Sequence, residues 1–487
     1  MKICMKSLDK LASRDIWRHF SDICGIPHPS KKEGRLVQHI KRFGESLGLE
    51  TIVDEIGNVL IRKAATAGME GCKSVVFQSH VDMVCEKNGD VEFDFDNDAI
   101  EPYVDGGWVK ARGTTLGADN GIGVAAQMAL LASKDIEHGP IECLFTVDEE
   151  TGLSGANAFG SGLLRSKILI NLDSEEDGNF CIGCAGGIDT VAKFPLEMKN
   201  APKDLFYFRV EVKGFKGGHS GEDINKGRGN AVQTLARYLC RLKREFPLAV
   251  SEIHGGNLRN AIAREAFAVV GVPYKQKERV RVMLNVFIDE IQREYPSETE
   301  FEMLLESEPA PELVMESTLS DNLLNALHAC IHGVVGMSSE IEGLVETSTN
   351  LASVRMVDGF VKVETSQRSS VESKKHDLKE RVEALFALAG AEVSHGDGYP
   401  GWKPNVNSEI KSVVVDTYRS LFGREPIVRA IHAGLECGLI FEKYPDMDMI
   451  SIGPTIIGNH SPAEMVDIES VDKFWLHLKA ILKALKA

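Results

Sequence analysis

The stretch SVVFQSHVD, residues 74–82, runs from an apolar segment directly into a histidine and an aspartate. Three further apolar runs end in a similar way, at the acidic triplet 148–150, at Asp173 and, through a Gly/Pro loop, at His460. In open α/β sheets, ligands bind outside the carboxyl ends of the strands, so groups far apart in sequence converge at one edge. The four runs therefore predict an α/β sheet with a dinuclear metal site at that edge.

The chain of 487 residues predicts two domains, because a single hydrophobic core stops growing at about 250–300 residues. A Gly-rich tract at 177–187 interrupts the alternation of strand and helix patterns, and a Pro/Gly segment at 396–401 marks a return linker. We expect a discontinuous metal-binding domain, residues 1–186 and 400–487. Residues 187–399 are expected to form a second domain inserted into it.

Several local elements follow from hydrophobic periodicity. Residues 8–48 predict two amphipathic helices, and residues 50–62 predict a strand hairpin. In the insert, 206–212 predicts a strand and 231–244 a helix. The acidic segment 296–316, which contains three prolines, is expected to connect two halves of the insert.

Composition limits the classes of function. The chain is 43% hydrophobic and 26% charged, and it has no uninterrupted apolar stretch near the roughly 18–20 residues that a membrane helix needs. Residues 1–17 predict an amphipathic helix rather than a secretory signal, so we expect a cytoplasmic protein. A net charge of −17 argues against nucleic acid and anionic membranes as partners, and it is compatible with a divalent cation.

The ten cysteines are scattered, which fits reduced thiols better than a disulfide framework. Only Cys181 and Cys184 form a C-x-x-C pair. Without a second pair, this spacing is weak support for zinc or redox chemistry, and we assign it neither role.

His80 is followed two residues later by Asp82, a carboxylate placed to hold the imidazole in the tautomer that coordinates metal. Taken alone, the motif also fits an ordinary histidine at a strand end. Asp119, in the sequence LGADNG, is open to two interpretations: a cap for the helix that follows, or a carboxylate that bridges two metal ions.

The triplet Asp148-Glu149-Glu150 places three carboxylates between a buried strand and a helix. Helix N-termini favour acids, which explains part of this pattern. The functional interpretation gives the two glutamates different roles: Glu150 is a metal ligand, and Glu149 is the general base that accepts a proton from water. Together with Asp173 and His460, this donor set suits two zinc ions, with manganese or cobalt as substitutes.

One motif points elsewhere. Residues 121–126, GIGVAA, match the G-x-G-x-x-A dinucleotide fingerprint, but they follow a polar loop where that fingerprint requires a buried strand. The chain contains neither a G-x-x-x-x-G-K-[ST] phosphate loop nor a G-x-S-x-G nucleophile elbow. We therefore place nicotinamide chemistry well behind the metal-dependent interpretation.

These motifs resemble those of the M20 metallopeptidase family, and the resemblance spans almost the whole chain. It is closest to the bacterial dipeptidases of that family which act on Xaa-His. The stretches that carry it are SHVDMV at 79–84, ARGTTLGADNGIG at 111–123, GCAGGID at 183–189, KGGHSG at 216–221, IHAGLECG at 431–438 and GPT at 453–455.

The resemblance implies an α/β fold, a zinc-peptidase-like catalytic domain with an inserted α+β lid domain. It also implies the roles of individual residues. The implied metal ligands are His80, Asp119, Glu150, Asp173 and His460, with Asp119 bridging; Glu149 is the implied general base, and Asp82 orients His80. In the lid, His219 polarises the scissile carbonyl, Asn260 and Arg368 contact the substrate, and Gly434 and Glu436 lie in a substrate-facing loop.

The implied activity is hydrolysis of unblocked dipeptides, with a preference for Xaa-His, by an enzyme holding two Zn²⁺. An N-acyl amino acid deacylase is the alternative within the same superfamily. A non-catalytic metal-binding scaffold is less well supported, because it would not need an uncoordinated base such as Glu149. The expected partners are small dipeptides, and the sequence leaves a homodimer open. We expect His219 to act on the metals of its own chain.

Overall fold

The computed structural model describes residue 8 and residues 10–485. They form two compact units. Unit 1 comprises Met1–Gly183, Pro404–Ala430 and Leu435–Ala487, and unit 2 comprises Cys184–Lys403 and Ile431–Gly434. Residues 1–7 and 9 of the amphipathic helix expected at the N-terminus lie outside the described residues. The two helices expected within 8–48 are α2 (Arg14–Cys24) and α3 (Gly34–Ser46).

Unit 1 is built on an eight-stranded sheet in the order β1-β2-β6-β3-β7-β21-β8-β20. Its strands are β1 (Glu50–Val53), β2 (Val59–Lys63), β3 (Val75–His80), β6 (Ile141–Thr146), β7 (Ile168–Asn171), β8 (Asn179–Cys184), β20 (Ile427–Ile431) and β21 (Asp448–Ser451). The four apolar runs of the sequence became β3, β6, β7 and β21. These strands are consecutive neighbours and mutually parallel, so their carboxyl ends meet at one edge, as predicted.

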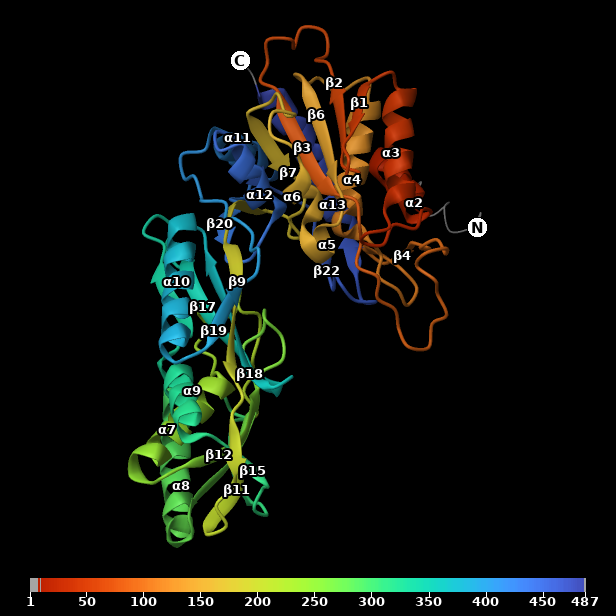
Figure 1. Ribbon diagram of the computed structural model, residues 1–487. Helices are drawn as coiled ribbons and strands as arrows, with labels where there is room; N and C mark the ends of the chain where they lie inside the picture. Colours follow the sequence, from red (N-terminus) through yellow and green to blue (C-terminus); the bar gives the residue numbers. More distant parts are fainter. Residues whose placement is uncertain (1–7, 9, 486–487) are drawn as a thin grey trace. The chain divides into compact units, whose positions relative to one another are not determined.

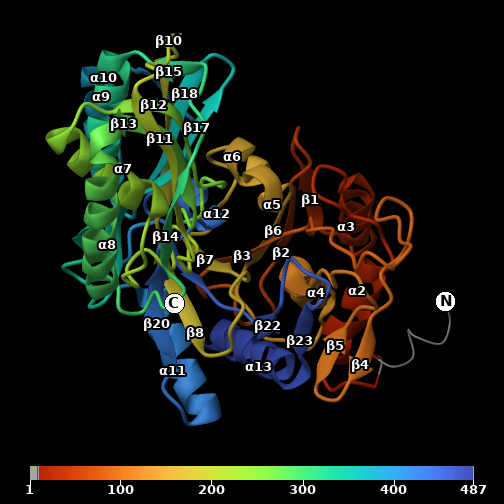
Figure 2. The same ribbon diagram turned by 90° about the horizontal axis from the view of Figure 1, so that it is seen from below.

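Strands β3 and β6 are buried along their whole length, the pattern of a parallel sheet covered on both faces. Helix α4 (Ala118–Ala132) packs between β3 and α2 (Figure 2). The remaining helices of unit 1 are α5 (Glu149–Gly152), α6 (Ser154–Ala158), α11 (Glu409–Phe422), α12 (Glu436–Lys443) and α13 (Ile468–Ala484). A small second sheet has the order β22 (Ile456–Ile457), β23 (Met465–Asp467), β5 (Trp108–Lys110) and β4 (Tyr103–Asp105).

The G-x-G-x-x-A match lies within α4, where packing explains its glycines. A Cβ at Gly121 would lie 3.0 Å from the ring of Phe20, and a Cβ at Gly123 would overlap the side chain of Asn120. Because these glycines allow α4 to approach its neighbours closely, the motif needs no nucleotide to account for it.

Unit 2 is an antiparallel nine-stranded sheet in the order β14-β11-β13-β12-β17-β18-β9-β19, with β16 also paired to β17. Its strands are β9 (Gly186–Pro195), β11 (Leu205–Lys213), β12 (Ala249–Gly255), β13 (Ala266–Pro273), β14 (Glu302–Ser307), β16 (Gly333–Met337), β17 (Val345–Val357), β18 (Phe360–Ser369) and β19 (Glu392–His395). The short strands β10 (Met198–Asn200) and β15 (Leu313–Met315) pair separately.

Helices lie along one face of this sheet (Figure 1). They are α7 (Ala231–Glu245), α8 (Lys277–Glu294), α9 (Ser317–Ala329) and α10 (Glu372–Leu388), with the 3₁₀ turn η1 (Tyr274–Gln276) before α8. Their apolar sides share one core with the strands, including Leu235 from α7 and Phe287 from α8. The result is the α+β architecture expected for the insert.

In the Gly-rich tract 177–187, β8 continues the sheet of unit 1 and β9 begins at Gly186, with no helix between the two strands. One local expectation was wrong. The segment 296–316 is more than a connector, since β14 forms the edge of the large sheet beside β11. Buried Phe301 and Met303 supply the apolar contacts that hold this segment on the core despite its acidic composition.

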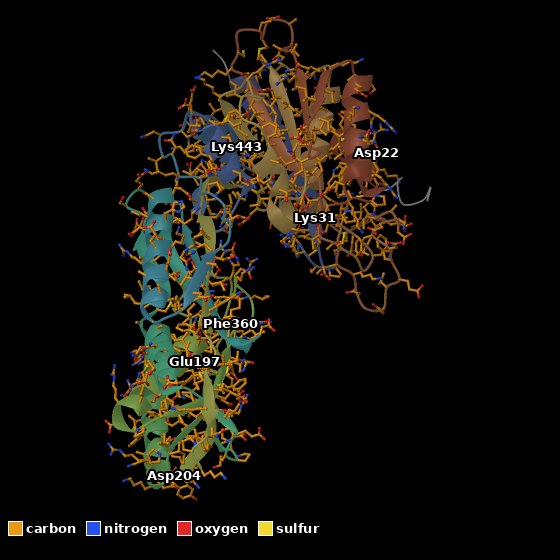
Figure 3. The ribbon with its side chains drawn as sticks, in the orientation of Figure 1. Asp22, Lys31, Glu197, Asp204, Phe360 and Lys443 are labelled. Atoms are coloured by element: carbon orange, nitrogen blue, oxygen red, sulfur yellow. The ribbon has the colours of Figure 1, made fainter. Side chains whose placement is uncertain are left out.

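Charged side chains lie at the surface of both units, such as Lys31 in unit 1 and Asp204 in unit 2 (Figure 3). Some of them tie elements together, as Lys443 of α12 does by donating from Nζ to the carbonyl oxygen of Ala156, 2.7 Å away. Cys181 and Cys184 are both buried in β8. Among the helices of the described residues, none has the length and apolarity required to cross a membrane.

Candidate metal centre

The carboxyl edge of the unit 1 sheet brings all five expected ligands together. His80 is the last residue of β3, and its Nε2 lies 3.2 Å from Oδ1 of Asp119 and 3.4 Å from Oδ1 of Asp173. Asp119 lies at the start of α4, and Asp173 lies two residues beyond the end of β7. These three side chains form a first group of candidate ligands.

A second group forms around His460, which lies in the loop between β22 and β23. Its Nε2 lies 3.0 Å from Oε2 of Glu150 and 3.5 Å from Oδ2 of Asp119. Asp119 therefore turns one oxygen toward His80 and the other toward His460. The carboxylate shared by both groups has the position that a bridge between two cations requires.

The donor chemistry of this cluster fits divalent metal ions. His80, Asp119 and Glu150 each offer a ligand atom within 4.8 Å of the others. Three carboxylates face only two imidazoles, and four of the five side chains are at most 10% exposed. Such a concentration of negative charge at a buried place needs a compensating cation. Nitrogen and oxygen donors without a thiolate suit zinc, manganese or cobalt.

The protonation behaviour of His80 reflects the same excess of acid. Burial by itself lowers the pKa of His80, but the charge of Asp173 and hydrogen bonds with Asp119, Asp173 and Asp82 raise the pKa well above its usual value. For His460, hydrogen bonds to Asp119 and Glu150 raise the pKa to about 11. In both histidines the neighbouring carboxylates attract positive charge to the ring, which is the place that a metal ion would take.

Asp82 connects His80 to the acidic loop. Nδ1 of His80 lies 3.4 Å from Oδ1 of Asp82, which fits the expected orienting contact. The same carboxylate accepts the backbone N–H groups of Glu149 at 2.9 Å and Glu150 at 3.1 Å, and the hydroxyl of Ser30 at 2.8 Å. Asp82 therefore fixes the imidazole and the first turn of α5 relative to each other.

The two glutamates of the acidic triplet differ in their surroundings. The carboxylate of Glu150 pairs with His460, whereas that of Glu149 has no ion pair or hydrogen bond with any other described residue. Burial raises the pKa of Glu149 well above its usual value; the charge of His80 opposes this rise, and Asp173 and Glu436 add to it. A buried carboxylate with raised proton affinity, beside the ligands yet separate from them, is suited to accept a proton.

Two residues near the candidate ligands, one in the acidic triplet and one in the loop between β22 and β23, have unusual backbone conformations. Asp148 and His460 have φ angles of 52° and 58°, in the left-handed region that residues other than glycine seldom adopt. Side-chain hydrogen bonds from Thr151 and Ser154 to the Asp148 carboxylate stabilise the first loop. Such conformations persist where the surrounding structure enforces them, and they are common at functional sites.

Glu464 is a residue of this centre that sequence reasoning missed. Its carboxylate, 3% exposed, accepts the backbone N–H groups of Leu116, Gly117, Ala118 and Asp119 at 2.7 to 3.3 Å. The loop that carries Asp119 is thus tied to the loop that carries His460. No capping hydrogen bond from the Asp119 side chain is present at the start of α4, so the cap interpretation of Asp119 does not hold.

The structure does not fit the expected substrate contact of Glu436. This side chain is completely buried, and its Oε2 accepts hydrogen bonds from Gln78 of β3 at 2.6 Å and Thr146 of β6 at 2.8 Å. The role that these contacts support is structural, because Glu436 links the two strands that end at His80 and at the acidic loop.

Unit 2 holds the other expected residues. Nδ1 of His219 accepts the backbone N–H of Glu222 at 3.2 Å, so a neutral ring carries its proton on Nε2 and can donate it. Burial and the charge of Arg368 lower the pKa of His219, which keeps the ring neutral. The backbone carbonyl oxygen of the exposed Asn260 accepts the N–H of Ser220, 2.8 Å away, beside His219.

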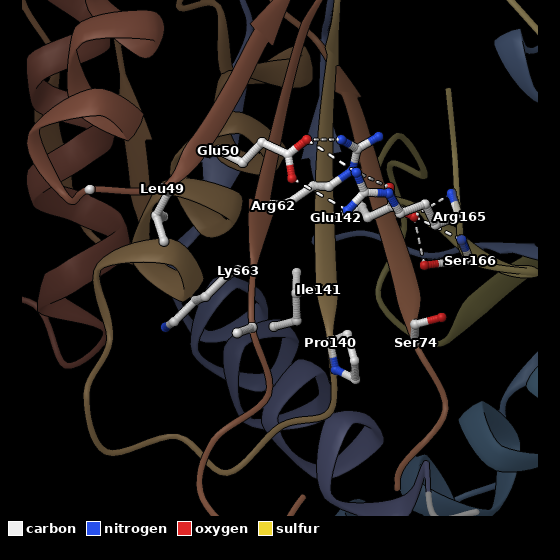
Figure 4. A pocket seen from close by; sticks show the side chains of 12 residues that line it. Leu49, Glu50, Arg62, Lys63, Ser74, Pro140, Ile141, Glu142, Arg165 and Ser166 are labelled. Carbon is white, nitrogen blue, oxygen red and sulfur yellow. Dashed lines mark hydrogen bonds and ion pairs between the residues drawn. The ribbon is translucent and has the colours of Figure 1, made fainter. Parts of the chain in front are cut away.

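Unit 1 contains a further cavity of about 380 Å³ (Figure 4), lined by the amino ends of β3 and β6. Both carboxylates in its lining are paired: Arg62 pairs with Glu142, 3.0 Å apart, and with Glu50, which also pairs with Arg165. Backbone N–H groups of Arg165 and Ser166 satisfy the second oxygen of Glu142. With both of its carboxylates paired to arginines, this cavity offers no counterpart to the carboxylate excess at the other end of the strands.

The contacts of Glu464 generate a prediction. Replacing it by glutamine keeps the shape of the side chain but leaves only one acceptor oxygen for four N–H groups. We expect Glu464→Gln to weaken metal binding by roughly 10- to 100-fold, the usual effect of losing a group that orients a ligand. Chelator titration of the metal-loaded protein measures this. Asp105→Asn, a carboxylate exposed on β4, is the control, and equal metal affinity in both variants would remove Glu464 from the centre.

Comparison with known proteins agrees with this site. The model of peptidase family M20/M25/M40 matches residues 76–484. The cytosol non-specific dipeptidase of Escherichia coli K12 is 43% identical over 484 residues, which cover 99% of this chain and 100% of that protein. The crystal structure of aminoacylhistidine dipeptidase from Vibrio alginolyticus superposes with a TM-score of 0.94 at 43% identity, covering 98% of each chain.

A more distant structure, aminopeptidase PepT from Bacillus cereus, shares the fold with a TM-score of 0.58 at 16% identity, covering 98% of this chain and 99% of that one. The family match includes β3, the acidic triplet, Asp173 and His460, the segments on which the candidate centre is built. The chain belongs to peptidase family M20/M25/M40.

Proposed function

We propose that this protein is a cytoplasmic dipeptidase with a dinuclear metal centre, occupied by two Zn²⁺, with Mn²⁺ or Co²⁺ as substitutes. The observation that carries the proposal is the position of Asp119, which turns one oxygen toward each of two histidine-carboxylate groups. His80 and Asp173 would hold one ion, and His460 and Glu150 the other. Asp119 would bridge them.

Bound metal ions supply Lewis acidity, which activates a water molecule and polarises the peptide carbonyl. The chain's own groups handle the proton. Glu149 accepts it from the attacking water and returns it to the leaving amine, a role that suits a buried carboxylate with a raised pKa. Asp82 keeps His80 and the backbone of Glu149 in place while this happens.

Unit 2 supplies the groups for the rest of the substrate. We propose that it acts as the lid, with Nε2–H of His219 donating to the carbonyl oxygen as negative charge develops there. Arg368 and Asn260 would bind the carboxyl end of the peptide. Proteins related to this chain bear the names non-specific dipeptidase and aminoacylhistidine dipeptidase, which supports unblocked dipeptides, including Xaa-His, as substrates.

A panel of dipeptides, assayed with defined added metals, tests the proposed activity. We expect turnover of Ala-His and of several other unblocked dipeptides, and loss of activity with a chelator that is restored by zinc. N-acetyl-Ala-His is the control that separates a dipeptidase from an N-acyl amino acid deacylase. Hydrolysis of the acetylated compound with no turnover of any free dipeptide would contradict the proposal.

The division of roles within the acidic triplet is tested by two variants. Glu149→Gln should lower kcat by at least ~10²-fold with both metals retained, because a general base is lost but no ligand. Asp119→Ala should lose metal, because the shared carboxylate serves both ions. Metal analysis beside kinetics decides the matter. Loss of a metal equivalent in Glu149→Gln would make Glu149 a ligand, and full loading of Asp119→Ala would exclude a bridge.

We further propose that His219 acts on the metals of its own chain, even in a homodimer. The insert contains two strand-helix halves, long enough to form a complete lid within one subunit. Mixing the inactive variants Glu149→Gln and His219→Ala under conditions of subunit exchange tests this. No activity should return, because each subunit keeps its own defect. Recovery near half of the wild-type activity would show that His219 is delivered by the partner subunit.

A further inference from the structure

A buried cation without an acidic partner stands out in unit 2. Arg368, near the end of β18, is 7% exposed. Among the described residues, no carboxylate oxygen lies within 4 Å of its guanidinium, and its Nε has no hydrogen-bond partner. Burying an uncompensated charge is costly, so a site built in this way is suited to receive an anion. The proposed function assigns that anion to the substrate carboxylate.

Arg368 lies on β18, between the neighbouring strands β17 and β9. Its cross-strand partners are Ser348 of β17 and Gly187 of β9. Ser348 is hydrogen-bonded to Nε2 of His432, 2.7 Å away. At Gly187 the missing side chain leaves room for the ring of Tyr399, because a Cβ there would lie 2.7 Å from that ring.

Tyr399 is held firmly in this place. Its backbone N–H and carbonyl pair with Gly187 at 2.8 and 3.0 Å, and its carbonyl also accepts Nζ of the buried Lys375 at 2.7 Å. On a further side, the ring lies against Gly434, where a Cβ would come within 2.6 Å. Gly434, expected from the sequence to face the substrate, thus has a different use: its lack of a side chain makes room for Tyr399.

The hydroxyl of Tyr399 is the hydrogen-bond partner of the guanidinium. Nη1 of Arg368 donates to the tyrosine oxygen at 2.8 Å. A phenol that accepts one hydrogen bond still has its own O–H to donate, and no described residue accepts it. One rigid side chain therefore orients the arginine and also presents a second donor close to it.

We propose that Tyr399 is a specificity-determining positioning residue, which directs Arg368 toward the free C-terminal carboxylate of the peptide. Its O–H serves as a second donor to the same carboxylate. This inference rests on the proposed function and extends it to the class of substrate: peptides with a free carboxyl end, in preference to their amides. The phenol O–H adds a donor of fixed position to those of the guanidinium, so the two side chains together favour a planar acceptor that can accept from both.

Kinetics on a matched pair of substrates test the proposal. For Tyr399→Phe we expect kcat/KM on Ala-His to fall about 10- to 100-fold, mostly through KM, the scale for one hydrogen bond to a charged group. On Ala-His amide the loss should stay below about 3-fold. The matched control is Tyr207→Phe, at a buried tyrosine of unit 2 whose hydroxyl donates to the carbonyl of Pro202 at 2.9 Å. It should leave both substrates unaffected. Equal losses of Tyr399→Phe on acid and amide would overturn the proposal.

A second measurement separates positioning from a general structural role. In the Arg368→Met background, Tyr399→Phe should cause a smaller loss on Ala-His than in the wild type, because the part of its effect that acts through the orientation of the arginine is already absent. Losses that multiply would overturn the inference.

Binding gives a readout that does not depend on turnover. Calorimetry with the metal-loaded protein should show L-histidine binding more tightly than L-histidinamide, with this difference reduced in Tyr399→Phe. An undiminished difference in the variant would overturn the inference, even if no dipeptide is hydrolysed. Absence of turnover by the wild type would instead contradict the proposed function alone.

Discussion

Electrostatic repulsion among buried carboxylates is the constraint on which unit 1 depends. Asp119, Glu150 and Asp173 are brought within reach of only two histidines, at the edge where four parallel strands end. A parallel sheet produces this convergence without any local sequence signal, because each strand delivers its last residues to the same side. The excess of negative charge persists in a folded protein only if a cation compensates it. The ligand requirement thus follows from topology and charge together.

The ligands stay in register because other carboxylates, which bind no metal in our proposal, hold the backbone of the loops. Asp82 accepts N–H groups from the acidic loop, and Glu464 accepts four from the loop before α4. Charge-assisted hydrogen bonds of this kind are stronger than neutral ones and specify geometry. The left-handed conformations at Asp148 and His460 are maintained within this framework. Metal binding and loop conformation are consequently parts of one network.

The sequence predicted the strands of the parallel core well, because each is a short apolar run followed at once by a polar ligand. It could not predict Glu464, which lies 345 residues from Asp119 and looks like any glutamate in a loop. For Glu436 the sequence suggested a functional contact that the structure does not fit. A motif placed this residue beside the substrate, but its side chain is buried and accepts hydrogen bonds from two residues far away in sequence. The strand at 302–307 was missed because its acidic composition concealed the two apolar side chains near its start. In each case the deciding contact is distant in sequence.

The two units have charge imbalances of opposite sign. Unit 1 concentrates carboxylates around two imidazoles, whereas unit 2 buries the guanidinium of Arg368, and the charge of that group lowers the pKa of both His219 and His432 after burial itself. Neutral histidines beside the arginine can donate or accept hydrogen bonds without adding to its charge. In the proposed function, metal ions compensate the imbalance of unit 1, and the substrate carboxylate compensates that of unit 2. On that proposal, a dipeptide is the smallest peptide that offers both a carbonyl for the metal ions and a free carboxylate for Arg368.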